Sequence, residues 1–464
     1  MMVQCSGLAG KHWAERNGAL QASFRGWGES GCIMPIFAVE VFTPNDFPQY
    51  TYVERGAENL EHRLRDALKM PKAVVSISGP SKSGKTVLVE RVVTKENLID
   101  VSGAEIQSPA QLWDRVLDWM GAPSSVTKQS AKGSSDQVSG KVSGGVQLPL
   151  IAKVGADAGY QATTSQSGST TTTAARGGLT QVAKEIAGSA FIVLIDDFHY
   201  MNREVQVEAA KQIKTAAERG IRICVASVPH RSDDVVRSNP ELRGRTTNLD
   251  TTYWSPRELM QIATIGFARL NASIHERDAS RLANEACGSP QLMQAICLQA
   301  CYHLGLRVAQ ERQVAIRLDD EKFRAIMEST SLQSNHSSLV SRMHQGPKIR
   351  GTERKEFTFS DGTKGDVYRC LLLAIAQDPP TMDLPYTELM KRVERVCVND
   401  SPVGSSVKEA CMQIAKFALD MYPTQRIVEF DEETGTDTLS IVDPYWLFYL
   451  RSSPKLNSLA KQSS

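Results

Sequence analysis

The 464-residue chain has no long hydrophobic run and almost no excess of charge of either sign. No apolar segment approaches the ~20 residues that a membrane-spanning helix needs, and the N-terminus lacks the charged and then apolar pattern of a secretory signal. The 53 basic and 52 acidic residues leave a net charge of +1, so overall charge indicates neither a nucleic-acid nor a membrane partner. These absences predict a cytoplasmic globular protein, and its length predicts two or three domains.

The chain also lacks the paired cysteines of a disulfide framework or a structural metal site. Its nine cysteines are scattered and odd in number. Cys297 and Cys301 lie four residues apart on one face of an expected helix, near His303, but a second pair of metal ligands is missing. Cys224 lies in an apolar strand pattern. We therefore predict buried, reduced thiols.

What the sequence does contain is an alternation of helix and strand patterns. Leu60, Leu64 and Leu68 recur every four residues, which predicts a helix. Short apolar strand patterns follow at 73–78, 98–101, 191–195 and 221–228, with helical patterns between them. One of these helices begins with Ser108 as its N-cap and Pro109 at its first position. The alternation predicts an α/β fold with a parallel sheet.

The strongest chemical signal is GPSKSGKT at residues 79–86, a full match to the pattern G-x-x-x-x-G-K-[ST] of a phosphate-binding P-loop. It follows an apolar strand pattern and precedes the helical pattern TVLVERVV. Backbone N–H groups and the helix N-terminus would surround the phosphates, Lys85 would reach the β- and γ-phosphates, and Thr86 would bind Mg²⁺. The predicted cofactors are ATP and Mg²⁺. The predicted binding residues of the loop are Gly79, Pro80, Ser81, Lys82, Ser83, Gly84, Lys85 and Thr86.

A second signal is FIVLIDDFHY at 191–200, an apolar strand pattern that ends in two aspartates. This is typical of a Walker B element, in which Asp196 would hold Mg²⁺ and Asp197 would act as general base toward the attacking water. The alternative is a strand that simply runs into an acidic turn. Many ATPases have glutamate at the second position, and the shorter aspartate reaches less far.

Three further sets of residues are candidates by position. Ser227 ends the next strand pattern and would sense the γ-phosphate, with Arg231 as a weaker candidate and an ordinary strand end as the alternative. Arg243 and Arg245 would serve as arginine fingers toward a neighbouring subunit if the protein assembles, and otherwise as surface residues. Gly288, Ser289 and Pro290 predict a helix start, with the serine as cap.

With these motifs in view, the chain resembles the P-loop ATPases of the AAA+ and STAND group, and within it the origin-recognition and archaeal initiator ATPases. The resemblance covers about residues 52–450 and includes VASVPHR, CGSPQLMQ and the terminal IVDPYWLFYLR. It implies that Gly288 and Pro290 help to report the nucleotide state and that a winged helix closes the chain. The sequence departs from the group in lacking a sensor-2 arginine in SPQLMQAICLQA, an effector domain and a solenoid of repeats.

The predicted fold is an α/β P-loop NTPase core with a parallel sheet, a helical lid subdomain and a C-terminal winged-helix domain. The expected boundaries are an N-terminal extension at 1–51, the core at 52–254, the lid at 255–330, a linker at 331–356, the winged helix at 357–451 and a tail at 452–464. Residues 1–33 are expected to be disordered or to precede a true start at Met34. Residues 122–178, rich in Ser, Gly and Thr, are expected to form a disordered surface insertion, or a loop or hairpin centred on 148–154 that orders on a partner.

Three functions fit these residues. The resemblance implies an ATP-hydrolysing molecular switch, in bacterial signalling or defence, with a protein partner or self-assembly. The alternative is a DNA-directed ATPase, such as a replication initiator, loader or transposition helper. Residues 351–464 carry 13 basic and 17 acidic residues, a net charge of −4, and the expected wing at 431–437 is acidic, which disfavours DNA. The third is a scaffold that binds ATP only as a structural ligand.

Overall fold

The computed structural model describes residues 35–56, 59–122, 125–131, 160–164, 169–228, 238–242, 244–348, 354–423, 425–431 and 437–462. Of residues 125–131, 160–164, 169–175 and 461–462 it describes only the backbone. The chain divides into two compact units, Met1–Ile36 and Phe37–Ser464. Nearly all of the first unit, including the expected start at Met34, lies outside the described residues. The elements below belong to the second unit.

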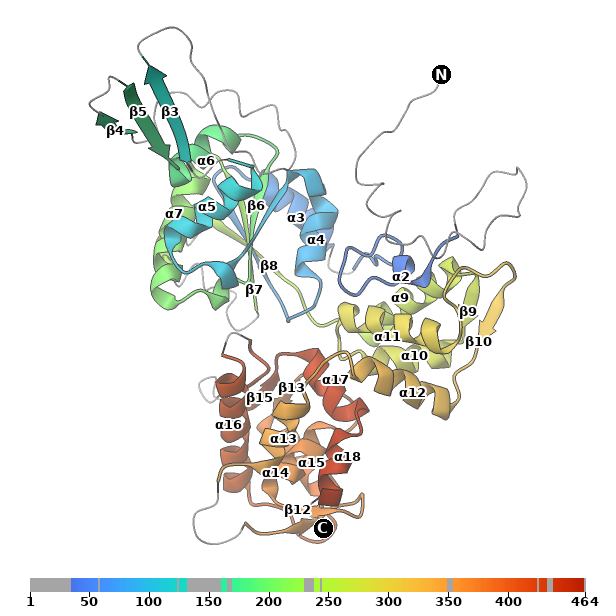
Figure 1. The fold of residues 1–464 in the computed structure, drawn as a ribbon. Helices are drawn as coiled ribbons and strands as arrows, with labels where there is room; N and C mark the ends of the chain where they lie inside the picture. The colour runs from blue at the N-terminus through green and yellow to red at the C-terminus, as the bar shows by residue number, and fades with distance from the viewer. Residues whose placement is uncertain are drawn as a thin grey trace. The chain divides into compact units, whose positions relative to one another are not determined.

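A five-stranded parallel sheet forms the centre of the predicted core (Figure 1). Its strands are β1 (Val74–Ser78), β2 (Leu98–Ser102), β6 (Ile192–Asp196), β7 (Arg222–Ser227) and β8 (Thr246–Asp250), in the order β2-β6-β7-β1-β8. The first four strands were predicted from their apolar runs. The sequence patterns missed β8, because Leu249 is the one buried residue of this edge strand.

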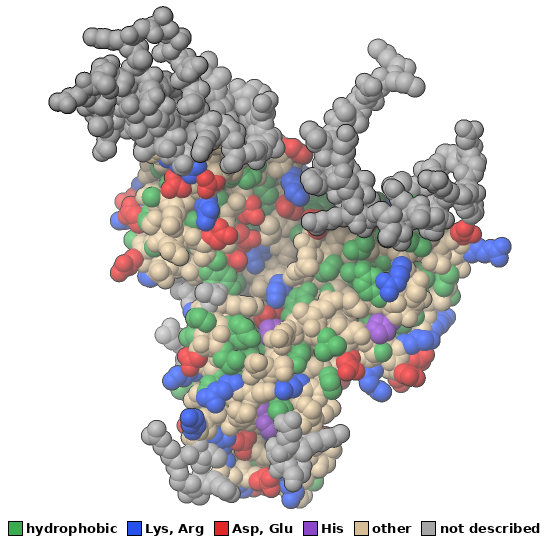
Figure 2. Space-filling model, viewed as in Figure 1, with side chains coloured by type: hydrophobic (Ala, Val, Ile, Leu, Met, Phe, Trp, Pro, Cys, Tyr) green, Lys and Arg blue, Asp and Glu red, His purple; other side chains and the backbone are tan. Residues whose placement is uncertain are grey.

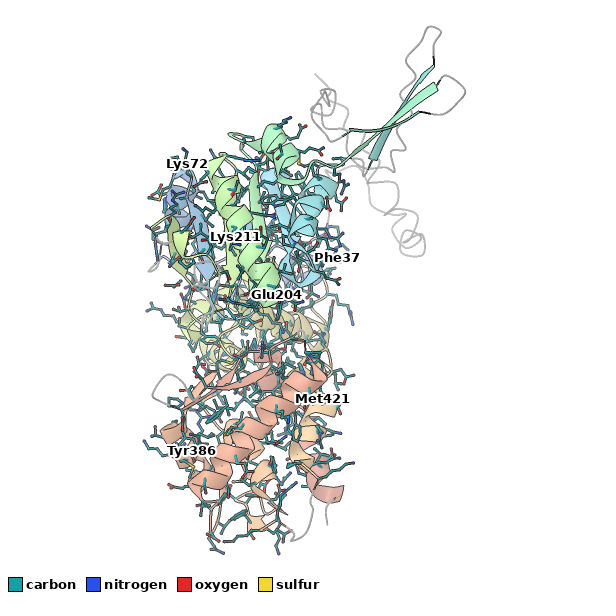
Figure 3. The ribbon with its side chains drawn as sticks, turned by 90° about the vertical axis from the view of Figure 1, so that its left-hand side faces the viewer. Phe37, Lys72, Glu204, Lys211, Tyr386 and Met421 are labelled. Carbon is teal, nitrogen blue, oxygen red and sulfur yellow. The ribbon has the colours of Figure 1, made fainter. Side chains whose placement is uncertain are left out.

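Helices cover both faces of this sheet, and the strand residues alternate between them. Val193 and Ile195 pack with α5 (Pro109–Trp119), α6 (Gly178–Ile186) and α7 (Arg203–Glu218). Ile192 and Leu194 pack on the other face with α3 (Leu60–Lys69) and α4 (Lys85–Val92). Charged side chains such as Glu204 and Lys211 lie on the exposed side of α7 (Figure 3). Burial on both faces explains why these strands are almost continuously apolar. Short 3-10 turns, η2 (Lys95–Asn97), η3 (Gly103–Glu105), η5 (Phe198–Tyr200) and η7 (Pro240–Leu242), complete the connections.

The Ser/Gly/Thr-rich insertion contains regular structure that its composition did not predict. Strands β3 (Ser125–Ala131), β4 (Tyr160–Thr164) and β5 (Ser169–Ala175) form an antiparallel sheet in the order β3-β5-β4. The apolar stretch at 148–154, which was expected to centre a partner-binding hairpin, lies outside the described residues.

The lid is helical, as the periodicity of residues 255–330 predicts. It consists of α9 (Pro256–Arg269), α10 (Glu276–Glu285), α11 (Pro290–His303) and α12 (Asp320–Ser331), joined by α2 (Ala38–Val41) from the start of the unit. Ser255 and Ser289 cap α9 and α11, each followed by proline at the first turn. Cys297 and Cys301 are buried in α11, as expected of core thiols. Two short strands, β9 (Ala272–Ile274) and β10 (Val314–Ile316), were not predicted.

The C-terminal region, which we define as residues 337–462, contains three helices and a β-hairpin in the predicted order. These are α14 (Val367–Ile375), α15 (Tyr386–Val396), α16 (Gly404–Met421), β14 (Val428–Asp431) and β15 (Thr438–Ile441), and β13 (Asp383–Pro385) adds a third strand to the hairpin. Shorter elements are β11 (Phe357–Thr358) and β12 (Lys364–Gly365). The segments predicted as linker and tail also contain helices, α13 (Ser337–Gln345) and α18 (Lys455–Gln462), and α17 (Pro444–Ser452) ends the segment predicted as the winged helix. Among the described residues no helix combines the length and apolar character needed to cross a membrane.

Candidate nucleotide-binding site

The phosphate loop connects β1 to α4 at the carboxyl edge of the sheet. Its first and last glycines are required by geometry. A Cβ on Gly79 would lie 1.7 Å from the Thr251 hydroxyl oxygen, and Gly84 has a φ of +90°, which side chains disfavour. The amide of Gly79 also donates to the Ser227 carbonyl at 3.2 Å, which ties the loop to the neighbouring strand.

Lys85, the first residue of α4, directs its ammonium back into this loop. Its Nζ donates to the carbonyl oxygens of Gly79 at 3.0 Å and Pro80 at 2.9 Å. Burial lowers the pKa of the Lys85 ammonium, and the charges of Asp196 and Asp197 partly offset that effect. A part-buried cation whose hydrogen-bond partners among the described residues are neutral carbonyls is well suited to an anionic ligand, because a phosphate would compensate its lost hydration.

Thr86 and Asp196 meet beside Lys85, as a metal site at these residues requires. The Thr86 hydroxyl donates to Asp196 Oδ2 at 2.5 Å, across 110 residues of sequence. The other Asp196 oxygen accepts from the Asp197 amide at 2.8 Å. A hydroxyl and a carboxylate side by side are ligands that Mg²⁺ prefers, so the residues present fit this ion.

Asp197 follows β6 in a left-handed backbone conformation, with a φ of +56°. Burial raises its pKa to about 6, the charge of Asp196 adds to the increase, and Lys85 opposes it. At neutral pH this carboxylate is mostly ionised but more basic than a solvated aspartate. That is the property expected of a general base.

Ser227 ends β7 beside the last residue of β1, in register with Ser78. Its side chain is 3% exposed, and its hydroxyl has no hydrogen-bond partner among the described residues. A buried hydroxyl without a partner costs stability, so this one is available for a group that enters the site.

Of the predicted arginines, Arg245 is the one that the structure describes, and it does not join this cluster. Arg231 and Arg243 lie outside the described residues. The Arg245 carbonyl accepts from the amide of Val74, at the amino end of β1, and its guanidinium pairs with Glu218. Arg245 therefore lies at the amino ends of the strands, opposite the end that carries the loop. Its role toward a neighbouring subunit stays a prediction.

The lid contacts the loop through the residues singled out in the sequence. The Ser289 hydroxyl donates to the Lys82 carbonyl at 3.1 Å, and Pro290 is the nearest neighbour of a Cβ placed on Gly84, at 3.8 Å. Gly288 has a φ of +71°, and a Cβ there would lie 3.0 Å from Tyr253. The structure thus brings Ser289 and Pro290 to the phosphate loop, whereas the neighbour of Gly288 is Tyr253.

Two contacts to the loop were missed by sequence reasoning. Trp254 Nε1 donates to the Ser83 carbonyl at 2.9 Å. Asp443, the N-cap of α17, holds the Lys82 ammonium at 2.6 Å, and the Lys82 Nζ also lies 4.4 Å from the centre of the Tyr445 ring. No local pattern could have indicated them, because 171 and 361 residues separate the partners.

The parallel sheet, the loop after β1 and the acidic end of β6 together make the fold that of a P-loop nucleotide-binding protein, which confirms the fold class predicted for the core. No protein-family model matches the chain, and no curated protein matches its sequence.

Among solved structures the chain is similar to Cdc6p of Pyrobaculum aerophilum, with 12% identity, a TM-score of 0.41 and coverage of 93% of this chain and 100% of that one. It is similar to the ORC2 protein of Aeropyrum pernix, with 13% identity, a TM-score of 0.43 and coverage of 92% and 98%. A Walker-type ATPase of Pyrococcus abyssi shows 12% identity, a TM-score of 0.44 and coverage of 86% and 96%. At these values, function has to be argued from the site itself.

Proposed function

We propose that the protein binds and hydrolyses Mg-ATP and acts as a nucleotide-driven molecular switch. Lys85 and the backbone N–H groups of the loop bind the triphosphate, and Thr86 with Asp196 holds Mg²⁺, which neutralises phosphate charge. Asp197 orients and deprotonates the attacking water, and Ser227 contacts the terminal phosphate through its free hydroxyl. The clustering of the Lys85, Thr86, Asp196 and Asp197 side chains supports these roles.

The observation that carries the switch is that the lid and the C-terminal region both contact one residue of the phosphate loop. The backbone of Lys82 accepts from Ser289 of the lid, and its side chain pairs with Asp443 of the C-terminal region. A change in the loop on nucleotide exchange therefore acts on both parts at once. In this proposal the ADP state is closed, ATP opens or assembles the protein, and hydrolysis resets it.

Two variants test the ATPase assignment on the full chain. Lys85→Ala should abolish the thermal stabilisation by Mg-ATP, which reaches ~2.7 kcal/mol when the nucleotide is at about 100 times its dissociation constant. Lys72→Ala is the matched control, because Lys72 lies before β1 at the opposite end of that strand (Figure 3). If Lys85→Ala keeps the full stabilisation, the loop is not the binding site.

Asp197→Asn should retain binding and lower phosphate release by roughly 10²–10⁴-fold. Asp100→Asn, at an exposed residue of the neighbouring strand β2, is the control, because it makes the same change of side chain outside the proposed catalytic position. Equal phosphate release by the wild type and Asp197→Asn would remove Asp197 from its role, and no release by the wild type above background would favour the scaffold function.

The alternative function is a DNA-directed ATPase, which the three helices and hairpin of the C-terminal region favour. Charge weighs against it, because basic and acidic side chains are interspersed over the described surface of the face in Figure 2. A pull-down with Asp197→Asn, which should accumulate the ATP-bound state, separates the two. Retained protein partners without nucleic acid support the switch, whereas retained DNA supports the alternative. The same experiment in cytoplasmic extract identifies the partner or self-assembly.

A further inference from the structure

We propose that Lys82 reports the nucleotide state by exchanging its ion pair with Asp443 for the terminal phosphate of ATP, which releases the start of α17. The inference rests on the proposed function and deepens it. It assigns to Asp443, a residue of the C-terminal region, control over the relative affinities of the loop for ATP and ADP.

Lys82 belongs to the phosphate loop, and its ammonium pairs with Asp443 of the C-terminal region. The left-handed backbone of Lys82, with a φ of +60°, is part of the turn that shapes this loop. The contact from Ser289 holds its carbonyl, so the side chain can turn without movement of the backbone. Its Nζ lies 2.6 Å from Asp443 Oδ1, and its side chain remains 27% exposed.

The Asp443 carboxylate, by contrast, has little freedom. It is 3% exposed, and its other hydrogen-bond donors are neutral, namely the Tyr445 amide at 3.0 Å and the Gln425 side-chain amide at 3.0 Å. The His336 ring lies 3.8 Å away, but burial lowers the His336 pKa, so the ring is neutral near pH 7. Among the described residues, Lys82 therefore supplies the positive charge that compensates this buried carboxylate.

A γ-phosphate bound in the loop should weaken the ion pair between Lys82 and Asp443, because it attracts the Lys82 ammonium and repels the Asp443 carboxylate. Once Lys82 turns away, Asp443 is a buried anion without a counter-charge, a state that favours exposure of the carboxylate. ADP lacks this phosphate and therefore leaves the pair largely intact.

Thermodynamic linkage makes the effect reciprocal: if ATP weakens the contact between Lys82 and Asp443, loss of the contact must favour ATP over ADP. Asp443→Asn should therefore raise the ratio of affinities for a non-hydrolysable ATP analogue and ADP by on the order of tenfold, within the usual range of coupling between sites. Asparagine keeps an oxygen for the amide of Tyr445 and so preserves the cap of α17.

The test measures both affinities by calorimetry on the full chain for wild type, Asp443→Asn, Lys82→Gln and the double variant. Asp420→Asn, an exposed residue of α16, controls for the change in net charge. We expect Lys82→Gln to lower ATP affinity more than ADP affinity, and Asp443→Asn to have no further effect in that background. Lys82 lies in a part-exposed loop, so this arm remains informative if Asp443→Asn folds poorly.

Hydrogen exchange of the α17 backbone gives a readout independent of turnover. It should be faster in nucleotide-free Asp443→Asn than in nucleotide-free wild type, and faster in wild type with the ATP analogue than with ADP. An unchanged affinity ratio in Asp443→Asn, with normal nucleotide binding by the wild type, overturns the exchange of Lys82. Absence of nucleotide binding by the wild type overturns the proposed function instead.

Discussion

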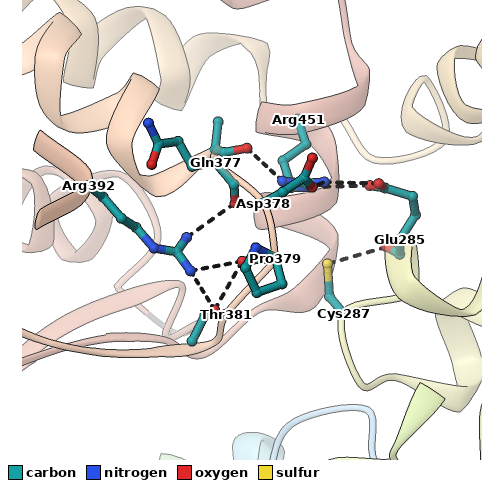
Figure 4. Close-up of polar contacts among 9 residues, drawn as sticks. Glu285, Cys287, Gln377, Asp378, Pro379, Thr381, Arg392 and Arg451 are labelled. Atoms are coloured by element: carbon teal, nitrogen blue, oxygen red, sulfur yellow. Dashed lines mark hydrogen bonds and ion pairs between the residues drawn. The ribbon is translucent and has the colours of Figure 1, made fainter. Parts of the chain in front are cut away.

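The ion pair between Arg451 and Glu285 should stabilise the contact of the C-terminal region with the lid, while the pair between Arg451 and Asp378 should contribute little. Figure 4 shows both carboxylates beside the same guanidinium. Arg451 contacts Glu285 at 2.9 and 3.2 Å and Asp378 at 2.6 Å. Distance alone would favour Asp378.

Burial makes the pair with Glu285 the stronger of the two. The side chains of Arg451 and Glu285 are 8% and 18% exposed, whereas Asp378 is 86% exposed. Burial alone would lower the Arg451 pKa, but hydrogen bonds and charge from Glu285, followed by Asp378, raise it above its usual value. We expect a coupling energy of about 2 kcal/mol for Arg451 with Glu285 and below about 1 kcal/mol for the solvent-screened pair with Asp378.

The measurement is a pair of double-mutant cycles with Arg451→Met, Glu285→Gln and Asp378→Asn, in which methionine keeps much of the apolar stem. Native-state hydrogen exchange of α17 gives the free energy of local opening, which avoids the assumption that a chain of several domains unfolds in two states. Arg451→Met alone should lower that free energy by about 3 kcal/mol, because it leaves a buried carboxylate unpaired. A coupling to Asp378 equal to or larger than that to Glu285 would refute the argument from burial.

Three further substitutions have expected signs. Ser227→Ala should raise the free energy of unfolding of the nucleotide-free protein by ~1–3 kcal/mol, since it removes a buried hydroxyl that has no partner among the described residues. It should also lower phosphate release. A lower melting temperature of the nucleotide-free variant would contradict the stabilisation. Gly288→Ala should lower the free energy of unfolding by about 1–2 kcal/mol because of the φ of +71° at this residue, and the close contact to Tyr253 should add to that loss. An unchanged midpoint of urea unfolding would show that the lid adapts. Trp113→Phe should lower the free energy of unfolding by about 1 kcal/mol, because it removes the 2.7 Å hydrogen bond from Trp113 Nε1 to Gln212. An unchanged melting temperature would refute the contribution of that hydrogen bond.

The sequence predicts best those features that depend on neighbouring residues. The apolar runs of β1, β2, β6 and β7 reflect burial on both faces, and the loop at 79–86 is readable because its glycines satisfy local backbone demands. The cap at Ser289 and the acidic end of β6 are local in the same sense. The fold class and the meeting of Thr86 with Asp196 therefore follow from pattern and from the rule that parallel strands end at one edge.

Features that depend on distant parts of the chain were not predictable. Strand β8 is polar and has one buried residue, so its place at the edge of the sheet comes from pairing with β1. Helix α13 lies in a polar segment, where Leu339, Val340 and Met343 supply the buried face. The contacts of Trp254 and Asp443 with the phosphate loop arise only from the tertiary fold.

The two ends of α17 explain how a change of one charge in the loop can be transmitted. The helix runs from Pro444 to Ser452, and nine residues at ~1.5 Å each make a rigid rod of about 13 Å. Its start is held to the loop through the part-exposed Lys82, by the ion pair to Asp443 and the contact with the Tyr445 ring. Its end is held to the lid by two hydrogen bonds between the largely buried Arg451 and Glu285. Because the weaker attachment faces the nucleotide, release should begin at Asp443 and leave Arg451 as the pivot. Loss of the Arg451 contact should therefore uncouple the C-terminal region from the lid without a change in the preference for ATP or ADP, whereas loss of the Asp443 contact should change that preference first.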